Sequence, residues 1–170
     1  MELITVTKSE DALRQAFAGE SQANRKYTAF ADRADKEGYP QAARLFRAAA
    51  EAEAVHAGNH LRAMNGIGST PDNLREALAG ETTEFKEMYP GMIEIAKTEG
   101  NKVAEITLSY ANEVEKTHAG LYQNLMNKLD YVKEAYPYYV CPVCGMTVER
   151  EAPEICPVCG AKGELFKRID

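Results

Sequence analysis

Apolar residues recur every three to four positions along most of the first 135 residues, which is the spacing of one face of an α-helix. The pattern predicts four long helices, over about residues 7–38, 40–66, 71–99 and 102–129. Thr7 and Glu10 form the capping-box pattern that starts the first helix. Pro90 is expected to interrupt the third helix near Met88, because proline removes a backbone donor and clashes with the preceding turn.

The four stripes predict a mainly α protein, because amphipathic helices of this length bury their apolar faces most simply as a four-helix bundle. Leu45 is expected in that core, since it begins the stripe of the second helix. After about residue 135 the pattern changes to short segments rich in Pro, Gly and Cys. Two domains are therefore predicted: a helical bundle over residues 1–135 and a small metal-binding domain over residues 136–170.

The helical part contains an internal repeat. Residues 51–58 read EAEAVHAG and residues 113–120 read EVEKTHAG, while LRQAFAGES at residues 13–21 matches LREALAGET at residues 74–82. Each half of the bundle therefore offers one Glu on its first helix and a Glu-x-x-His on its second. The matched residues are Glu20, Glu53 and His56 in the first half and Glu81, Glu115 and His118 in the second.

This set of residues is typical of a two-metal site. Residues three apart on a helix project from the same face, so Glu53 and His56 can bind one ion, as can Glu115 and His118. One Glu from each of two helices and a Glu-x-x-His from each of the other two is the di-iron or di-manganese pattern of ferritin-like bundles. Any one of these residues could be an ordinary core or surface side chain, but two matching sets favour metal ligands. His60 has no counterpart in the second half and is not expected to be a ligand.

Glu84 breaks the symmetry of the repeat. It stands three residues after Glu81, whereas the position three residues after Glu20 is Ala23. A seventh ligand on one side would make the two metals inequivalent. The alternative is a solvated glutamate on a helix that is rich in glutamate.

All four cysteines lie in the last 30 residues, within YVCPVCGMTVEREAPEICPVCG at residues 139–160. Two C-P-V-C-G turns place four thiolates around one tetrahedral ion, and backbone N–H groups after such turns can point at the sulfurs. The four predicted ligands are Cys141, Cys144, Cys156 and Cys159. The turns alone fit iron and structural zinc equally well. An iron centre beside a redox-active di-metal site would allow electron transfer between them, whereas zinc would not.

The composition argues against several other functions. The formal net charge of −6 and the lack of a dense basic stripe argue against a nucleic-acid partner. The N-terminus, MELITVTKSE, does not resemble a signal peptide, and no apolar run approaches the roughly 20 residues that a membrane span needs. A cytoplasmic protein with no membrane partner is therefore expected.

The order of these motifs resembles that of the rubrerythrins along nearly the whole chain: GESQANRKY, the first Glu-x-x-His, GETTEFKEMYP, the second Glu-x-x-His and a rubredoxin-like tail. The resemblance implies seven di-iron ligands, Glu20, Glu53, His56, Glu81, Glu84, Glu115 and His118. Glu53 and Glu115 would bridge the metals, and one iron would move between Glu84 and His56 with oxidation state. Tyr27 and Tyr89 would hydrogen-bond to ligand carboxylates, unless they only pack the core.

The resemblance also implies an activity. The protein would be a non-haem di-iron peroxidase that reduces hydrogen peroxide to water in oxidative-stress defence, and the four cysteines would hold one iron that returns electrons to the di-iron site. Rubredoxin or an NAD(P)H-dependent reductase would supply these electrons, and a homodimer or higher homo-oligomer is expected. Manganese or zinc could replace iron. The alternative is a ferritin-like iron oxidase or iron-handling protein with a structural zinc ribbon. Met146 departs from the family, where an aromatic residue often follows the first turn.

Overall fold

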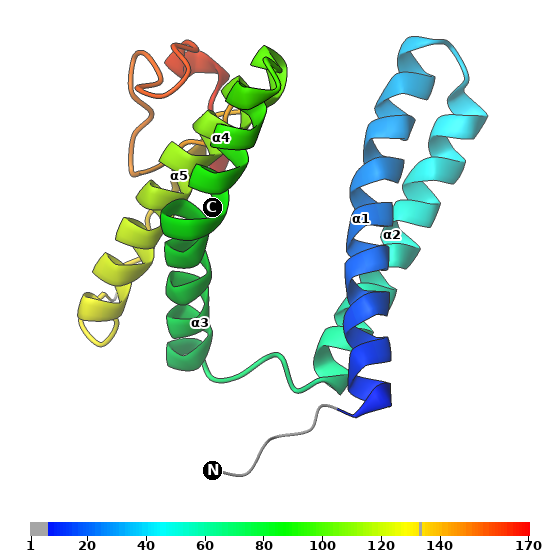
Figure 1. The fold of residues 1–170 in the computed structure, drawn as a ribbon, viewed down its shortest axis with the longest axis horizontal. Coiled ribbons are helices and arrows are strands. Elements are labelled where there is room, and N and C mark those ends of the chain that lie inside the picture. Colours follow the sequence, from blue (N-terminus) through cyan, green and yellow to red (C-terminus); the bar gives the residue numbers. More distant parts are fainter. Residues whose placement is uncertain (1–6, 133) are drawn as a thin grey trace. The chain divides into compact units, whose positions relative to one another are not determined.

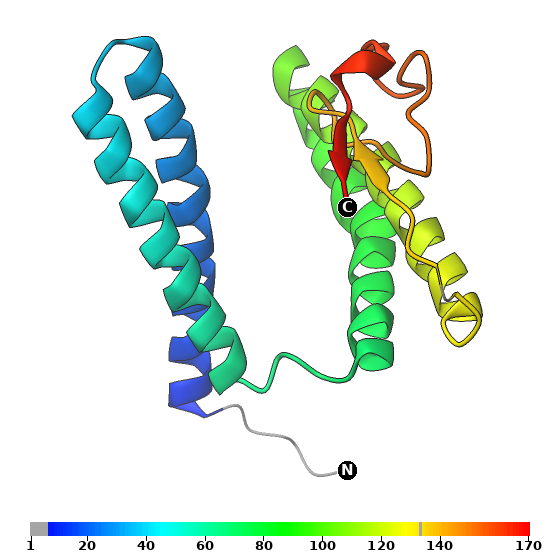
Figure 2. The same cartoon turned by 180° about the vertical axis from the view of Figure 1, so that it is seen from behind.

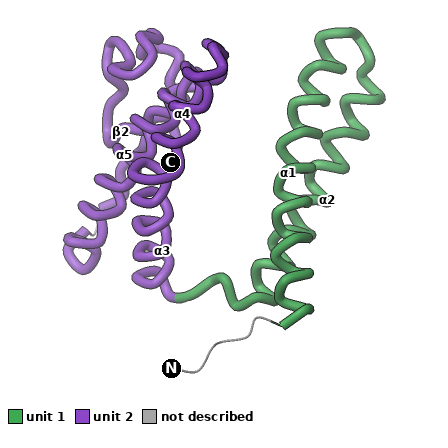
Figure 3. The backbone as a smooth tube through the Cα atoms, in the orientation of Figure 1, with its two compact units in different colours: residues 1–68 green, residues 69–170 purple. Residues whose placement is uncertain are grey.

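The computed structural model describes residues 7–132 and 134–170. They belong to two compact units, Met1–Gly68 and Ser69–Asp170, which are coloured separately in Figure 3. Helices dominate both units, and a small sheet follows at the C-terminal end of the chain (Figure 1). None of the helices in the described residues is both long and apolar enough to cross a lipid bilayer.

The first unit is a pair of helices, α1 (Lys8–Lys36) and α2 (Pro40–Ala63). The predicted capping box is present, because the Thr7 side chain accepts from the Glu10 N–H and the Glu10 carboxylate accepts from the Thr7 N–H. The chain turns between the helices at Gly38, whose φ of +80° is readily adopted only by glycine. Both helices therefore begin and end close to the positions that the sequence predicts.

The residues of α1 and α2 that are buried are all small. They are alanines: Ala31 and Ala34 on α1 and Ala43, Ala50 and Ala57 on α2. The α2 alanines are seven residues apart, which is the repeat of a coiled-coil seam. Leu45 lies off this seam, and 68% of its surface is exposed, so it is not buried within this helix pair, and its place in the bundle core stays a prediction.

The second unit begins with α3 (Thr70–Thr83), the π-helix η1 (Glu84–Met88) and α4 (Tyr89–Thr98), followed by α5 (Lys102–Lys128). The predicted interruption of the third helix is therefore present, but it takes the form of a wider turn. The Tyr89 N–H donates to the carbonyl of Glu84, five residues earlier. This turn directly precedes Pro90, which has no N–H to continue the α-helical pattern.

The tail contains three short antiparallel strands and one 3₁₀ turn, drawn in yellow-orange to red in Figure 2. The elements are β1 (Tyr138–Val140), β2 (Thr147–Glu149), η2 (Gly163–Leu165) and β3 (Lys167–Ile169), and the strand order is β2-β1-β3. At the centre of β1, Tyr139 pairs with Val148 on one side and Arg168 on the other. The core of the tail consists of Cys141, Cys156 and Phe166, so the metal-binding turns lie inside this small domain.

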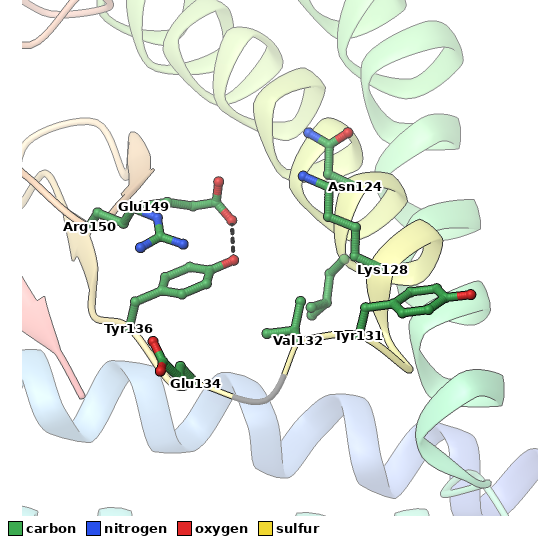
Figure 4. Close-up of a pocket in the computed structure, with 9 residues that line it drawn as sticks. Asn124, Lys128, Tyr131, Val132, Glu134, Tyr136, Glu149 and Arg150 are labelled. Atoms are coloured by element: carbon green, nitrogen blue, oxygen red, sulfur yellow. Dashed lines mark hydrogen bonds between the residues drawn. The ribbon is translucent and has the colours of Figure 1, made fainter.

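The tail contacts α5 within the second unit. Val114 of α5 lies beside Gly145, where an added Cβ would be 3.8 Å from Val114 Cγ1. A cavity of about 440 Å³ lies between the end of α5 and the tail (Figure 4). There the Tyr136 hydroxyl donates to Glu149 Oε1 at 2.7 Å, and the Arg150 guanidinium lies 4.2 Å from the centre of the Tyr136 ring. The predicted metal ligands do not line this cavity.

Candidate metal centres

The first ligand set lies in the seam between α1 and α2. Glu20, Glu53 and His56 offer ligand atoms that all lie within 4.8 Å of one another. His56 Nδ1 is 3.0 Å from Glu53 Oε2, as expected for residues three apart on a helix. Beside them the Asn24 amide donates to the Ala50 carbonyl at 2.8 Å and ties the two helices together.

The two carboxyl groups of this set lie within hydrogen-bonding reach of each other and shift each other's pKa. The hydrogen bond to Glu53 raises the pKa of Glu20, and the same hydrogen bond, together with that from His56, lowers the pKa of Glu53. A cation placed between the two groups would remove the repulsion between the two carboxylates, so that both could be ionised. The arrangement is therefore that of a cation site.

The second ligand set repeats this geometry on α3 and α5. Glu81, Glu115 and His118 also offer ligand atoms within 4.8 Å of one another. His118 Nδ1 lies 2.7 Å from Glu115 Oε2 and 3.6 Å from Glu81 Oε1. All three side chains are largely buried, with 26% of His118 and 17–18% of the two carboxylates exposed. The internal repeat of the sequence is thus a repeat of two equivalent side-chain clusters.

Burial and negative charge shift the acid–base properties of the second set. Burial first, and then the carboxylates of Glu115 and Glu84, raise the pKa of Glu81 to about 7. Burial and the carboxylates of Glu115, Glu84 and Glu81 raise the pKa of Tyr89. Burial and the carboxylates of Glu81 and Glu115 raise the pKa of Tyr122. Both phenols therefore stay protonated and can act as hydrogen-bond donors beside the acidic cluster.

The remaining predicted residues lie near these sets without joining them. Glu84 begins the π-helix η1, and its charge acts on Glu81, but it is outside the cluster within 4.8 Å. His60 likewise lowers the pKa of Glu20 without belonging to the first set. Tyr27 packs between aromatic rings, 6.2 Å from Phe30 and 6.3 Å from Phe46 by ring centres. Its predicted hydrogen bond to a carboxylate therefore stays a prediction.

The two sets fit metal ions of the iron and manganese type. Ligand atoms about 2.1 Å from one ion at right angles are about 3 Å apart, close to the separations of 2.7 and 3.0 Å between histidine nitrogens and carboxylate oxygens. Carboxylate and imidazole ligands suit these metals better than soft ones. Each set supplies two carboxylates and one imidazole, so two sets match the composition of a di-metal site.

The third cluster consists of the four cysteine thiols of the tail. Cys141 Sγ lies 3.6 Å from Cys159 Sγ, and Cys144 Sγ lies 3.5 Å from Cys156 Sγ. These separations are too long for disulfides, whose sulfurs are about 2.05 Å apart. Four sulfurs at about 2.3 Å from a tetrahedral ion would be about 3.8 Å apart, so the cluster fits one ion.

Backbone groups complete the cysteine cluster, as the sequence predicts. The N–H groups of Met146 and Ala161 point at the sulfurs of Cys144 and Cys159, respectively. Burial acts against ionisation of Cys156, but the N–H groups of Cys159 and Val158 lower its pKa to about 7.

The two C-P-V-C-G turns have the same backbone geometry. Gly145 donates to the Cys141 carbonyl at 2.9 Å and Gly160 donates to the Cys156 carbonyl at 3.0 Å. Both glycines have positive φ, +84° and +76°.

Comparison with known protein families identifies this combination. The family model described as Rubrerythrin matches residues 11–126, and the model described as Rubrerythrin, rubredoxin-like domain, matches residues 139–167. The chain belongs to the rubrerythrin family. The fold class is thereby confirmed as a ferritin-like helical protein with a C-terminal rubredoxin-like domain.

Curated relatives and solved structures agree with this assignment. Rubrerythrin-2 of Clostridium acetobutylicum is 39% identical, with 92% of this chain and 94% of the relative covered. Rubrerythrin of Porphyromonas gingivalis is 36% identical, with 88% and 84% covered. A structure titled as the fully reduced, all-ferrous state of nigerythrin is 33% identical and has a TM-score of 0.59, with 97% of this chain and 88% of nigerythrin covered.

Family membership makes this rubrerythrin an oxidoreductase with a carboxylate–histidine metal site and a rubredoxin-like metal site. The domain boundary at residue 135 stays a prediction, since the compact units divide instead at residues 68 and 69. Two residues beside the second set, Tyr122 and Thr147, are not among those predicted from the sequence. The helical spacing could have indicated Tyr122, one turn beyond His118, but no sequence pattern indicates Thr147, which comes from the tail.

Proposed function

We propose that this rubrerythrin is a non-haem di-iron peroxidase that reduces hydrogen peroxide to water. The two carboxylate–histidine sets would together hold two irons, and the four cysteines would hold a third. The ligands would be the seven residues predicted from the sequence, with Glu84 as the additional ligand on one side. The observation that carries the proposal is the presence, in one chain, of two matched sets and a cysteine cluster.

The protein residues have distinct tasks in this proposal. Glu20, Glu53, Glu81 and Glu115 supply negative charge that would offset the charge of two divalent ions. The two histidines direct Nδ1 toward the carboxylates, at 3.0 and 2.7 Å. Tyr89 stays protonated beside the second set and can donate a hydrogen bond to a carboxylate or to bound peroxide.

Iron would supply the two electrons that break the O–O bond, and each peroxide would also take up two protons to give two waters. The cysteine cluster suits the return of electrons, because backbone N–H groups directed at sulfurs stabilise the reduced, more negative state of such a site. A rubredoxin or an NAD(P)H-dependent reductase would supply those electrons. We also propose a cytoplasmic location and a homodimer or higher homo-oligomer.

A stoichiometric peroxide titration tests the proposed activity. The iron-loaded protein is fully reduced without oxygen, and hydrogen peroxide is added in steps while the remaining reducing equivalents are counted. Two electrons should disappear for each peroxide consumed. Glu115→Gln should slow peroxide consumption severely, whereas Glu113→Gln, an exposed position on the same helix, should not.

Two outcomes would contradict the peroxidase proposal. In one, the reduced protein reacts with dioxygen and accumulates iron but leaves peroxide unconsumed. In the other, the cysteines hold zinc in the protein as isolated from its natural source. Together these outcomes would favour the iron-oxidising alternative with a structural zinc ribbon.

A further inference from the structure

Both ring nitrogens of His118 have partners in the second unit. Nδ1 faces the acidic cluster, 2.7 Å from Glu115 Oε2, and Nε2 lies 2.9 Å from the Thr147 hydroxyl oxygen. Thr147 is the first residue of β2, so this contact joins a candidate metal ligand on α5 to the cysteine-containing tail. His56, the equivalent ligand of the first set, has no such partner for Nε2 among residues 7–68, where its bond is to Glu53.

The hydrogen-bonding capacity of threonine decides the direction of this contact. A hydroxyl has one hydrogen to donate, and the Thr147 hydroxyl donates it to the Gly145 carbonyl at 3.0 Å. The oxygen of Thr147 must therefore accept a hydrogen from His118 Nε2. With its hydrogen on Nε2, a neutral imidazole presents the lone pair of Nδ1 toward Glu81 and Glu115, which is the form that binds a metal.

We propose that Thr147 is a positioning residue of the second metal set. Its hydroxyl accepts the Nε2 hydrogen of His118, fixes the ring with Nδ1 toward the carboxylates, and connects this ligand to the first cysteine turn. The connection runs from His118 through the Thr147 hydroxyl to the carbonyl of Gly145, the residue bonded to Cys144. The cysteine site and the second ligand set of one chain are thus joined by two hydrogen bonds.

Packing around the contact supports a fixed position for Thr147. Tyr122, Leu125 and Tyr138 line a cavity together with His118 and Thr147. Val114, one turn before His118, lies beside Gly145, and only 2% of its surface is exposed. The tail therefore rests on α5 next to the histidine, and the hydrogen bond lies within this packed contact.

The substitution Thr147→Val tests the role of the hydroxyl, because valine keeps the shape of threonine and removes only the oxygen. Thr147→Ser keeps the hydroxyl and should restore wild-type behaviour. Thr98→Val is the matched control, since its hydroxyl bonds to the Glu94 carbonyl on α4, away from the ligand set. Loss of a residue that orients a metal-bound histidine costs about 10- to 100-fold in metal affinity or activity.

The first measurement is nitrogen NMR of the zinc-substituted protein, with label only in its three histidines. Zinc gives no paramagnetic broadening, and His118→Gln assigns the His118 signals. In the wild type and Thr147→Ser, the hydrogen of His118 Nε2 should exchange slowly with water, whereas in Thr147→Val it should exchange much faster. An unchanged exchange rate in Thr147→Val, or a His118 Nε2 without hydrogen in the wild type, would overturn the proposal.

A competition titration gives a second readout that does not depend on activity. Mn²⁺ should leave the carboxylate–histidine sites of Thr147→Val at a chelator concentration about 10- to 100-fold lower than for the wild type. Thr147→Ser and Thr98→Val should follow the wild type. Equal affinity in all four proteins would show that the hydroxyl does not position the ligand.

The connection to the cysteine site has a consequence that rests on the proposed function. In the proposed function, each electron that the oxidised carboxylate site gains comes from a reduced iron held by the cysteines. Thr147→Val should slow this internal transfer about 10- to 100-fold after a peroxide pulse. If the wild-type cysteine iron is never oxidised by peroxide, the proposed function fails, but the exchange and affinity measurements still decide the role of Thr147.

Discussion

Replacing the glycine of a cysteine turn with alanine should lower the affinity of the tail for its metal ion, by an amount that follows from the backbone geometry. Gly160 has a φ of +76°, and an added Cβ would meet no atom within 4 Å. The cost of Gly160→Ala is therefore conformational, about 1–2 kcal/mol for a non-glycine residue in the left-handed region. Because metal binding and folding of such a site are coupled, this cost should appear as a 5- to 30-fold weaker affinity, by the usual conversion of about 1–2 kcal/mol.

Gly145→Ala provides an internal comparison. Its φ is +84°, and an added Cβ would lie 3.8 Å from Val114 Cγ1, an ordinary packing distance. The two variants should therefore lose affinity by similar factors. Gly91→Ala is the control. Gly91 lies in α4, its φ is not positive, and an added Cβ would meet nothing within 4 Å, so the metal affinity of the cysteine site should be unchanged.

Cobalt(II) titration of the reduced protein is the assay, because the thiolate-to-cobalt absorption band reports only the cysteine site. A competing chelator brings the affinity into the measurable range. Wild-type affinity in both Gly160→Ala and Gly145→Ala would refute the reasoning, since the left-handed turns would then not be required for four sulfurs to converge. A much larger loss in Gly145→Ala alone would show instead that the added methyl group is not accommodated beside Val114.

Three further outcomes follow from the geometry. Mn²⁺ binding at the second set should weaken about tenfold per pH unit below pH 7, because the metal must displace a proton from Glu81, whose pKa is raised to about 7. Calorimetry at pH 6 and pH 8 measures the two affinities, and equal values would contradict the prediction. His118→Gln should lower the iron content at the carboxylate–histidine sites and leave the cysteine-site absorption intact, whereas loss of both would show a general folding defect. Asn24→Ala should destabilise the protein by about 1–2 kcal/mol in denaturant unfolding, because the Ala50 carbonyl loses its side-chain donor. An unchanged denaturation midpoint would show that water replaces the amide.

The sequence predicted the helices well because their ends carry local signals. The capping box at Thr7, the Pro40 at the start of α2 and the glycine after α1 each act within one turn of the chain. The interruption of the third helix was predicted from Pro90, but its form was not. A wider turn over Glu84–Met88 accommodates the missing N–H of Pro90 as well as a break in the helix would. No local signal in the sequence distinguishes the two.

The burial pattern was less predictable. The stripe that begins at Leu45 describes the face a helix would bury in a complete bundle, whereas the α1–α2 contact uses alanines seven residues apart. Alanine is only weakly apolar and contributes little to a hydrophobic pattern. The contact between these two helices therefore could not be separated from the rest of the bundle core by sequence alone.

The two ligand sets were visible in the sequence because Glu-x-x-His places both side chains on one helical face. The clusters of Glu20 with His56 and of Glu81 with His118 then follow from pairing neighbouring helices. Thr147 could not be predicted, because its contact with His118 joins residues 29 positions apart and depends on how the tail packs on α5. Glu84 was predicted as a ligand from the sequence, and its charge raises the pKa of Glu81, but its side chain is not part of the cluster of ligand atoms.

The most direct test of the account is a rapid visible spectrum of the iron-loaded, fully reduced protein after one equivalent of hydrogen peroxide without oxygen. The absorption of the oxidised iron–tetrathiolate centre should appear only after the carboxylate-bound irons have been oxidised, and it should fail to appear in Glu115→Gln. Appearance at the wild-type rate in Glu115→Gln would contradict the account, because peroxide would then oxidise the tail without the carboxylate–histidine site.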